Sequence, residues 1–187
     1  LTAFTSMGKI SRSLDMLNTS QYLKIRAQAF ANDGITSYPA TAYDINGTWD
    51  PNRDVDWTKL LLGGTALVNN IQLSLSGGKA DTQYLVSGTY RRETTVFPGD
   101  SHYGKGAVHS SLTHRSPDNR FHFQLSTNYT SDSNTLPGRD LTYSAYSLAP
   151  NAPELYDDLG KLNWEGGTFN NPLAFLESQY HTANTSL

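Results

Sequence analysis

The sequence predicts a mainly β fold: an antiparallel meander of the kind found in transmembrane β-barrel walls, with long loops that carry one or more short helices. Three observations lead to it. Between residues 70 and 131, polar and apolar side chains alternate in runs of about ten residues, as in strands with one wet and one dry face. Tight turns follow some runs and much longer loops follow others. Aromatic residues stand near both ends of the last run, as interfacial girdles require.

Composition narrows the classes of protein to which the chain can belong. Of 187 residues, 11 are Tyr and 7 are Phe, while charged residues make up only 17%, below the usual quarter. A net charge of −3 offers no basic surface for nucleic acid, and the absence of Cys removes disulfides and thiolate metal sites. The longest apolar run, Leu60–Val68, is too short for a membrane-spanning helix. Composition alone favours a soluble β-sandwich.

The N-terminal third is expected to contain one short strand and one helix. The first ten residues form an imperfect strand pattern, and 11–69 is interpreted as one long excursion carrying a helix at Asn18–Asn32. Asn18 can cap that helix, and Gln21, three residues later, completes an Asn variant of the capping box. Gly34 is placed to end it. The rest of the excursion is polar and rich in turn residues.

Four strands are predicted within residues 70–131. They are expected at 70–76, 82–93, 105–114 and 120–131, the third being weakly patterned. Tight turns are expected at Gly77–Asp81 and Ser116–Asn119, with a loop at 96–100. Residues 132–187 are interpreted as a second long loop, with short helical pieces near 143–148 and 172–180 and a new strand beginning at Asn184. About five strands are therefore expected.

In such a wall, one side of the meander would face lipid and the other a polar lumen. The lipid-facing row would comprise Ile71, Leu73, Leu75, Tyr84, Val86, Phe121, Phe123 and Leu125. The lumen row would comprise Gln72, Ser74, Gln83, Ser87, Gln124, Ser126 and Asn128. Outside a bilayer, the open edges and the apolar row lack partners. We therefore expect the isolated chain either to associate edge to edge or to bury this row against its own loops.

Five motifs occur in order along the chain. They are Asp56-Trp57; Ser74-Leu75-Ser76-Gly77-Gly78; Tyr84-Leu85-Val86-Ser87-Gly88-Thr89-Tyr90; residues 149–162, which read Ala-Pro-Asn-Ala-Pro-Glu-Leu-Tyr-Asp-Asp-Leu-Gly-Lys-Leu; and Asn171-Pro172-Leu173-Ala174. Together they resemble the SusC/RagA family of TonB-dependent outer-membrane transporters. The third motif departs from the family pattern at Thr89. The third strand departs as well, because Lys105-Gly106 and Ser111 replace an Arg-aromatic start and a central Asn.

The resemblance implies that residues 1–187 are the first barrel strands and extracellular loops after a plug domain, which this chain does not contain. A start at Leu1 and not at Met fits the expectation of a fragment. The resemblance also implies an importer of glycans or oligosaccharides in the bacterial cell outer membrane. Its partners would be a SusD-like surface lipoprotein, the lipid bilayer and TonB, the last through regions absent here. Transport would proceed by conformational gating.

The sequence predicts no catalytic residue, no metal site and no cofactor. Oxygen ligands alternate along Asp50–Asp56, but the sixth-position Gly of a calcium loop is absent and Leu61 replaces its Glu. Turn chemistry is the simpler use of these side chains. The five His show no metal-ligand spacing, and no Ser has a nucleophile-elbow context. A pair such as Glu154 and Asp157 imitates glycosidase acids only if the fold fixes their separation.

Loop aromatics are the predicted contacts for a ligand or partner. Trp49, Tyr146 and Trp164 lie in the excursions, and exposed rings bind sugars and anchor protein partners. The alternative is that these rings fold the loops onto one another. Two other functions stay open: a soluble β-rich carbohydrate- or protein-binding module of the bacterial envelope, and an enzyme acting on oligosaccharides. A detergent-requiring parent in the outer-membrane fraction separates the transporter from the soluble module.

Overall fold

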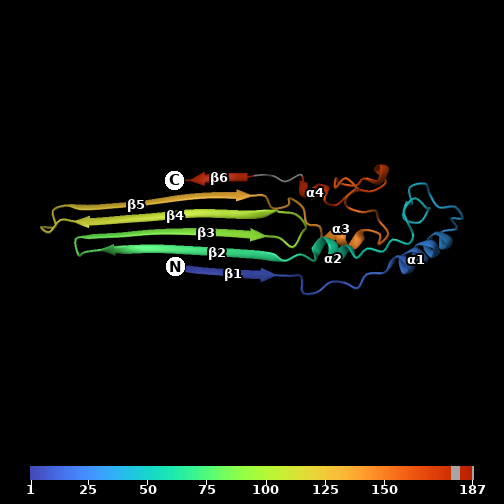
Figure 1. Ribbon diagram of the computed structural model, residues 1–187, viewed down its shortest axis with the longest axis horizontal. Coiled ribbons are helices and arrows are strands. Elements are labelled where there is room, and N and C mark those ends of the chain that lie inside the picture. The colour runs from blue at the N-terminus through green and yellow to red at the C-terminus, as the bar shows by residue number, and fades with distance from the viewer. Residues whose placement is uncertain (178–181, 187) are drawn as a thin grey trace.

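The computed structural model describes residues 1–177 and 182–186 and consists of two parts (Figure 1). One part is a long sheet. The other, which we call the cap, comprises residues 9–65, 95–101 and 135–177 and lies beyond one end of the sheet. The chain is therefore elongated, with tight turns at one end and the cap at the other.

The sheet is a six-stranded antiparallel meander in the order β1-β2-β3-β4-β5-β6. Its strands are β1 Thr2–Gly8, β2 Ala66–Gly78, β3 Thr82–Thr94, β4 His102–Arg115, β5 His122–Asn134 and β6 Thr182–Ser186. This confirms the mainly β class and the meander. The sheet is not closed, since β1 and β6 are its two edges. The expected count of about five strands was too low by one. β6, which pairs with β5, begins at Thr182, two residues before the strand start predicted at Asn184.

Strand pairing extends the strands beyond their alternating segments. β2 begins at Ala66, four residues before the predicted start, because Leu67 and Val68 pair with β1. β5 begins at His122, so Phe121 lies in the turn and not in the strand. That turn is longer than expected. The Ser116 N–H donates to the Phe121 carbonyl oxygen at 2.9 Å, and the Phe121 N–H donates to the Ser116 hydroxyl at 2.9 Å.

The predicted first helix is confirmed as α1, Thr19–Asn32. Asn18 Oδ1 accepts from the Gln21 N–H at 2.9 Å, and Gln21 Oε1 accepts from the Asn18 N–H at 3.2 Å, completing the capping box. At the other end Gly34 has φ +70°, and the Ile35 N–H donates to the Phe30 carbonyl oxygen. This is a Schellman ending, which explains the glycine there.

The cap holds four further helical pieces, of which α2 and η1 were not predicted. They are α2 Trp57–Leu62, α3 Thr142–Ser147, the 3-10 turn η1 Glu165–Gly167 and α4 Ala174–Glu177. α3 overlaps the predicted piece at 143–148 but begins and ends one residue earlier. α4 falls within the predicted piece at 172–180, of which 178–180 lie outside the described residues. α2 was missed because its six residues look like part of an apolar run.

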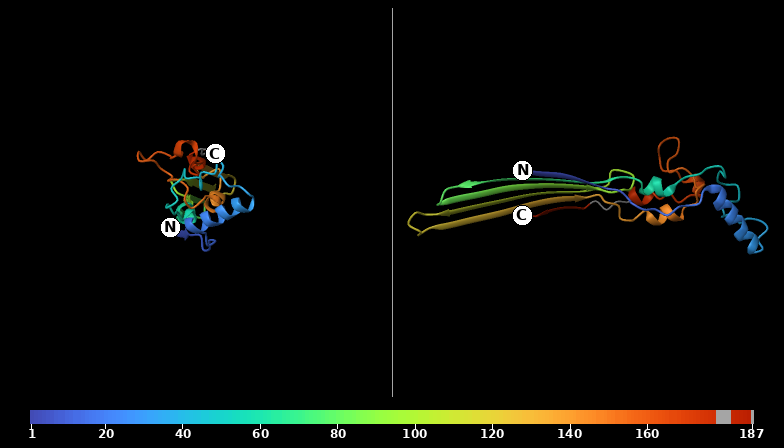
Figure 2. Two further views of the ribbon diagram at one scale, coloured as in Figure 1. Left: turned by 90° about the vertical axis from the view of Figure 1, so that its right-hand side faces the viewer. Right: turned by 90° about the horizontal axis from the view of Figure 1, so that it is seen from below.

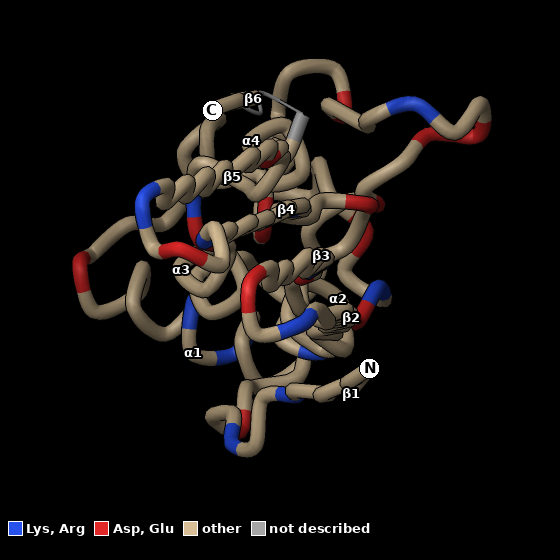
Figure 3. The backbone as a smooth tube through the Cα atoms, turned by 90° about the vertical axis from the view of Figure 1, so that its left-hand side faces the viewer, with Lys and Arg blue, Asp and Glu red and all other residues tan. Residues whose placement is uncertain are grey.

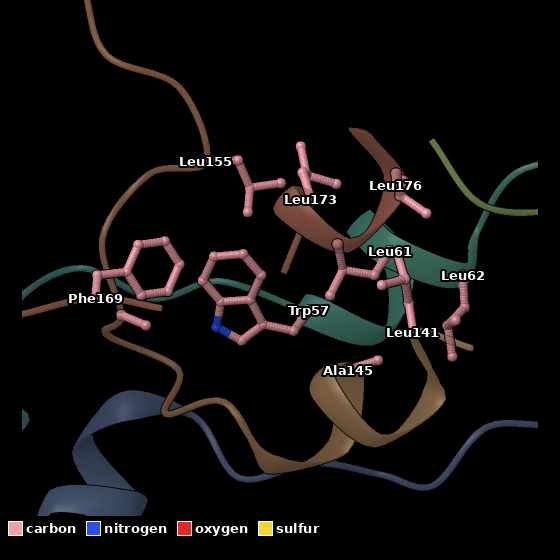
Figure 4. Close-up of a cluster of buried hydrophobic side chains, with 10 residues drawn as sticks. Trp57, Leu61, Leu62, Leu141, Ala145, Leu155, Phe169, Leu173 and Leu176 are labelled. Atoms are coloured by element: carbon pink, nitrogen blue, oxygen red, sulfur yellow. The ribbon is translucent and has the colours of Figure 1, made fainter. Parts of the chain in front are cut away.

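The hydrophobic core lies in the cap and not under the sheet (Figure 4). Its buried members are Trp57, Leu61, Leu62, Leu141, Ala145, Ala152, Leu155, Phe169, Leu173 and Leu176. By contrast, no described strand residue is buried. The sheet is a single layer, visible edge-on in Figure 2, and no segment among the described residues covers either face. Burial of the apolar row by the loops was one of the two outcomes expected for an isolated chain, and the described loops do not bury it.

The accessible surface measures how far the chain departs from a closed globule. It is 12789 Å² for 20.6 kDa, whereas a compact monomer of that mass exposes about 8,900 Å². The excess of about 3,900 Å² comes from the uncovered sheet and the extended outline of the molecule.

Candidate functional site

The first candidate surface is the apolar face of the sheet. Antiparallel register places Ile71 opposite Tyr90, and Leu112 opposite Leu125. We define the apolar face as Ile71, Leu73, Leu75, Tyr84, Val86, Tyr90, Val108, Leu112, Phe123, Leu125 and Tyr129. These side chains are 36–63% exposed. All members of the predicted lipid-facing row lie on this face except Phe121, which precedes β5.

Two polar pairs lie within or beside the apolar face, and each is internally satisfied. The hydroxyls of Ser110 and Thr127, opposite each other on β4 and β5, are 2.6 Å apart. At the turn end, Thr82 Oγ1 is 2.8 Å from His114 Nδ1. Cross-strand hydrogen bonds of this kind reduce the cost of placing a hydroxyl among apolar neighbours.

The opposite face of the sheet is polar and holds the whole predicted lumen row. Its members are Gln72, Ser74, Gln83, Ser87, Gln124, Ser126 and Asn128, joined by His109 and His122. His109 Nδ1 lies 2.7 Å from Asn128 Oδ1. Arg91 forms an ion pair with Glu93 on this face.

Charge is scarce in the strands (Figure 3), and the strand register distributes it unevenly between the two faces. Six Lys, Arg, Asp and Glu residues lie in the described strands: Arg91, Arg92, Glu93, Lys105, Arg115 and Asp132. Register puts five of them on the polar face, and only Arg92 on the apolar one. Arg92 lies beyond Tyr90, at the end nearest the cap. The apolar face is therefore uncharged along the rest of its length in the described strands.

The Asp56-Trp57 motif holds the cap together. Asp56 Oδ1 accepts from the Lys59 N–H at 2.9 Å and so caps α2. A hydrogen bond from the Thr58 hydroxyl, with the Lys59 amide, lowers the pKa of the Asp56 carboxyl. Trp57 is 3% exposed, and its Nε1 donates to the Ala149 carbonyl oxygen at 2.8 Å. The motif thus starts a helix and fastens it to the segment at 149.

The last motif of the resemblance serves the same purpose. The Asn171 side chain, in a residue only 2% exposed, donates through Nδ2 to the carbonyl oxygens of Leu155 and Asn163 at 2.6 and 3.0 Å. Its Oδ1 accepts from the Leu173 N–H. One buried amide therefore joins three segments of the cap.

The aspartates of the 50–56 cluster also have structural partners. Asp50 Oδ1 accepts from the Asn52 N–H at 2.9 Å, the Asx turn that the sequence predicts. Asp54 Oδ1 accepts from both the N–H and the hydroxyl of Thr19 at 2.8 Å, which ties the start of α1 to the cap. Within the described part of the chain, no group of three or more His, Asp or Glu side chains is arranged to hold a metal ion.

A buried carboxylate fastens the middle of α1. Asp44 Oδ2 accepts from the Tyr22 hydroxyl and from Arg26 Nε, each at 2.8 Å. Burial, followed by the hydrogen bond to Asp44, raises the pKa of Tyr22 to about 12. The Asp44 carbonyl oxygen in turn accepts from Asn151 Nδ2 at 2.8 Å. The helix is thereby linked to the segment that follows α3.

The structure separates the three predicted aromatic contacts. Trp49 packs against the core, and its Nε1 donates to Thr168 Oγ1 at 3.1 Å, so it helps to fold the loops together. Tyr146 also packs on the core, and it lines a hollow beside Lys9 and α2. Trp164 is 48% exposed. Contact of these rings with a ligand stays a prediction.

Trp49 also lines a polar hollow of about 320 Å³ on the cap. Its other residues include Tyr156, which is 51% exposed, and Arg53. Arg53 Nη1 pairs with Glu154 Oε1 at 2.9 Å, while Arg53 Nε is buried without a partner in the described structure. Aromatic rings beside hydrogen-bonding groups suit a sugar or another polar ring. Arg53 and Tyr156 were missed because no local pattern marks them; the folding of distant loops brings them together.

Two comparisons with known sequences found no match for the chain. No protein-family model matches it, and no curated protein sequence matches it. In the described residues, no helix is long and apolar enough to span a membrane.

Proposed function

We propose that the chain forms part of the wall and outer cap of a TonB-dependent outer-membrane β-barrel of the SusC/RagA type, whose intact form imports a glycan or oligosaccharide. The observation that carries this proposal is the single-layer sheet, exposed and apolar on one face, exposed and polar on the other. The apolar face is unfavourable in contact with water, and the polar face is unfavourable in contact with lipid. A barrel wall has lipid outside and water inside.

The dimensions of the sheet support the same proposal. β2 to β5 contain 13 or 14 residues each, whereas about 9–11 suffice for a tilted strand to cross a bilayer. The turns after β2 and β4 are short, and the longer connections all belong to the cap. Outer-membrane barrels have this asymmetry, with short periplasmic turns and long extracellular loops. In the proposed orientation, the cap lies outside the cell.

The resemblance supplies the transport cycle. A plug inside the barrel would be displaced through TonB, and a SusD-like surface lipoprotein would present the substrate above the cap. The hollow around Trp49, Arg53 and Tyr156 is the place on this chain best suited to contact sugar rings. Import by this route leaves every bond of the substrate intact, so the proposal assigns the chain no catalytic residue.

Adjacent single cysteines test the wall directly. The sequence contains no Cys, so Leu73→Cys and Ser74→Cys each give one labelling site in this region of the full-length protein. With a nitroxide attached and the protein in lipid vesicles, we expect the label at 73 to collide with dissolved oxygen and not with an aqueous nickel complex. The label at 74 should show the opposite behaviour. Leu159→Cys, at an 81% exposed position on the cap, is the aqueous control.

A soluble binding module of the bacterial envelope is the second candidate, favoured by the self-contained core and hollow of the cap. It predicts a native parent that needs no detergent and that exposes both the 73 and 74 labels to the aqueous reagent. Either result would rule out the barrel wall.

A further inference from the structure

The polar face of the sheet changes its chemistry close to the cap. Strand pairing arranges its residues in rows that cross the sheet, and two adjacent rows cross all six strands at the end nearest the cap (Figure 1). We call these two rows the belt. One row contains Phe4, Arg91, Lys105 and Asp132, and the other contains Glu93 and Tyr103.

The rest of the polar face lacks this combination of side chains. From the belt to the tight turns, the described strands present hydroxyls, amides and histidines on this face, with no Phe, Tyr or Trp. The one charged residue there is Arg115, at the end of β4. The belt therefore contains both Phe and Tyr rings of the polar face and four of its five charged residues.

The charges of the belt balance one another. Arg91 forms an ion pair with Glu93. Register places Lys105 opposite Asp132, whose Oδ2 accepts from Asn184 Nδ2 at 3.2 Å. Lys105 also lies directly opposite Arg91, although like charges in such a position destabilise a sheet. Within the described residues Lys105 is exposed and forms neither an ion pair nor a side-chain hydrogen bond, so its ammonium group is free to donate to a ligand.

The two rings of the belt are open to the surroundings. Phe4 is 49% exposed and Tyr103 is partly exposed. Neither belongs to the cap core, and neither contacts another ring in the described structure. Three strand spacings and two residues separate them, so their backbones are about 16 Å apart. Arg91 and Glu93 lie on the strand between. A single sugar ring cannot contact both aromatic rings, but a short oligosaccharide can.

We infer that the belt is a subsite for a neutral oligosaccharide, on the polar face directly below the cap. This inference rests on the proposed function and adds the class of substrate and the place where it binds beyond the cap. Phe4 and Tyr103 stack against sugar rings at the two ends of the subsite, while Arg91, Lys105 and Asp132 exchange hydrogen bonds with hydroxyls between them. Because its charges balance, the belt gives an acidic glycan no net attraction.

Protection of a cysteine tests the position of the subsite. Asn70 pairs with both Phe4 and Arg91, so Asn70→Cys places a thiol inside the belt. Ser76→Cys, on the same face of the same strand, places one about 20 Å away as the matched control. Each variant of the full-length protein, in lipid vesicles, is treated with a water-soluble thiol reagent. The probes are neutral hexasaccharides of glucose, xylose and mannose, with hexagalacturonate as the acidic comparison.

We expect the thiol at 70 to react in the absence of sugar, and at least one neutral probe to slow this reaction without slowing the reaction at 76. Hexagalacturonate should slow neither. Calorimetry with the same neutral probe should show that Tyr103→Ala weakens binding by about tenfold. Tyr103→Phe keeps the ring and should retain the affinity, as should Gln124→Ala, which lies on the polar face outside the belt.

Several results would overturn the subsite and leave the barrel wall intact. A thiol at 70 that does not react without sugar would show that another part of the protein covers the belt. Equal protection at 70 and 76, or wild-type affinity in Tyr103→Ala, would place the sugar elsewhere. Equal protection by hexagalacturonate would overturn the neutral class. If none of the four probes binds the wild type, the proposed glycan import fails, and the subsite fails with it.

Discussion

The cap and the sheet use their apolar side chains in opposite ways. In the cap, Trp57, Leu61 and Phe169 are at most 3% exposed and pack together, although they come from distant segments. In the sheet, Leu73 and Leu125 are 59% and 48% exposed. The cap therefore has a core that stabilises it in water, whereas the sheet holds its shape by backbone pairing and leaves its apolar face to the surroundings.

Because of this difference, removing an apolar side chain has a different energetic effect in each part. Removing one from the cap opens a cavity, and its cost does not depend on the solvent outside the protein. Removing one from the exposed face of the sheet leaves no cavity and changes only the free energy of contact between that face and the surrounding water or lipid. The four predictions below test this contrast, beginning with the largest expected effect.

Truncation in the cap core should cost the most. Trp57→Ala removes a buried ring and its hydrogen bond to the Ala149 carbonyl oxygen. We expect a loss of about 3–5 kcal/mol in cap stability. Hydrogen exchange of the cap amides, measured by mass spectrometry, should show it. Trp164→Ala, at a 48% exposed ring, is the control and should change exchange little. Similar exchange in both variants would show that the cap core is not the source of stability.

A charge at the centre of the apolar face is the next most damaging change. With the apolar face in lipid, as the proposed function requires, Leu73→Arg should destabilise the protein by about 2–4 kcal/mol, whereas Ser74→Arg, on the polar face, should have little effect. Unfolding by urea from lipid vesicles, with the two variants measured side by side, gives the difference. Equal costs for the two variants would remove the distinction between the faces.

Loss of the α2 cap should have an intermediate effect that depends on pH. Asp56→Ala should cost about 1 kcal/mol at neutral pH. The folded-state pKa of Asp56 lies below its ordinary value of 3.8. The Asp56 carboxylate therefore contributes fully to the free energy of unfolding above pH 3.8. This contribution declines in more acidic solution, as Asp56 is protonated first in the unfolded chain and then in the folded one. The wild type should therefore lose its advantage over Asp56→Ala below about pH 4. An advantage that persists in stronger acid would argue against this cap.

The smallest effect concerns α1. The pKa of Tyr22 is raised to about 12 from an ordinary 10.0, so the unfolded chain ionises first, and the stabilising contribution of Tyr22 is lost as the pH rises through this interval. A tyrosinate absorbance titration should show one late component that Tyr22→Phe abolishes. Tyr143→Phe, at an 80% exposed ring, should leave that component unchanged.

The sequence predicted features that depend on neighbours along the chain. The capping box at Asn18 and the alternation along β5 are local, and both were recovered. β4 was only weakly marked because Gly104 and Gly106 interrupt its apolar side, yet pairing with β3 and β5 fixes its register. Asp56 is a helix-cap signal that could have revealed α2.

The candidate sites could be predicted only in part, for a related reason. Alternation assigned residues to the two faces, since that needs only the period of a strand. The hollow beside Trp49 depends on contact with segments more than a hundred residues away, such as Thr168, and no local pattern encodes such contacts. The resemblance likewise identified Asn171 without showing that its amide joins three segments.

The long-range contacts of the cap have a kinetic consequence. Trp57 binds the Ala149 carbonyl oxygen across 92 residues, whereas the three hairpins β2–β3, β3–β4 and β4–β5 join residues close in sequence. Loop closure makes distant contacts slow to form, so the hairpins can fold first and the cap only afterwards. The strands β2 to β5 lie between the two halves of the cap core. A slip in their register would shift those halves past each other, so completion of the cap acts as a check on correct strand assembly.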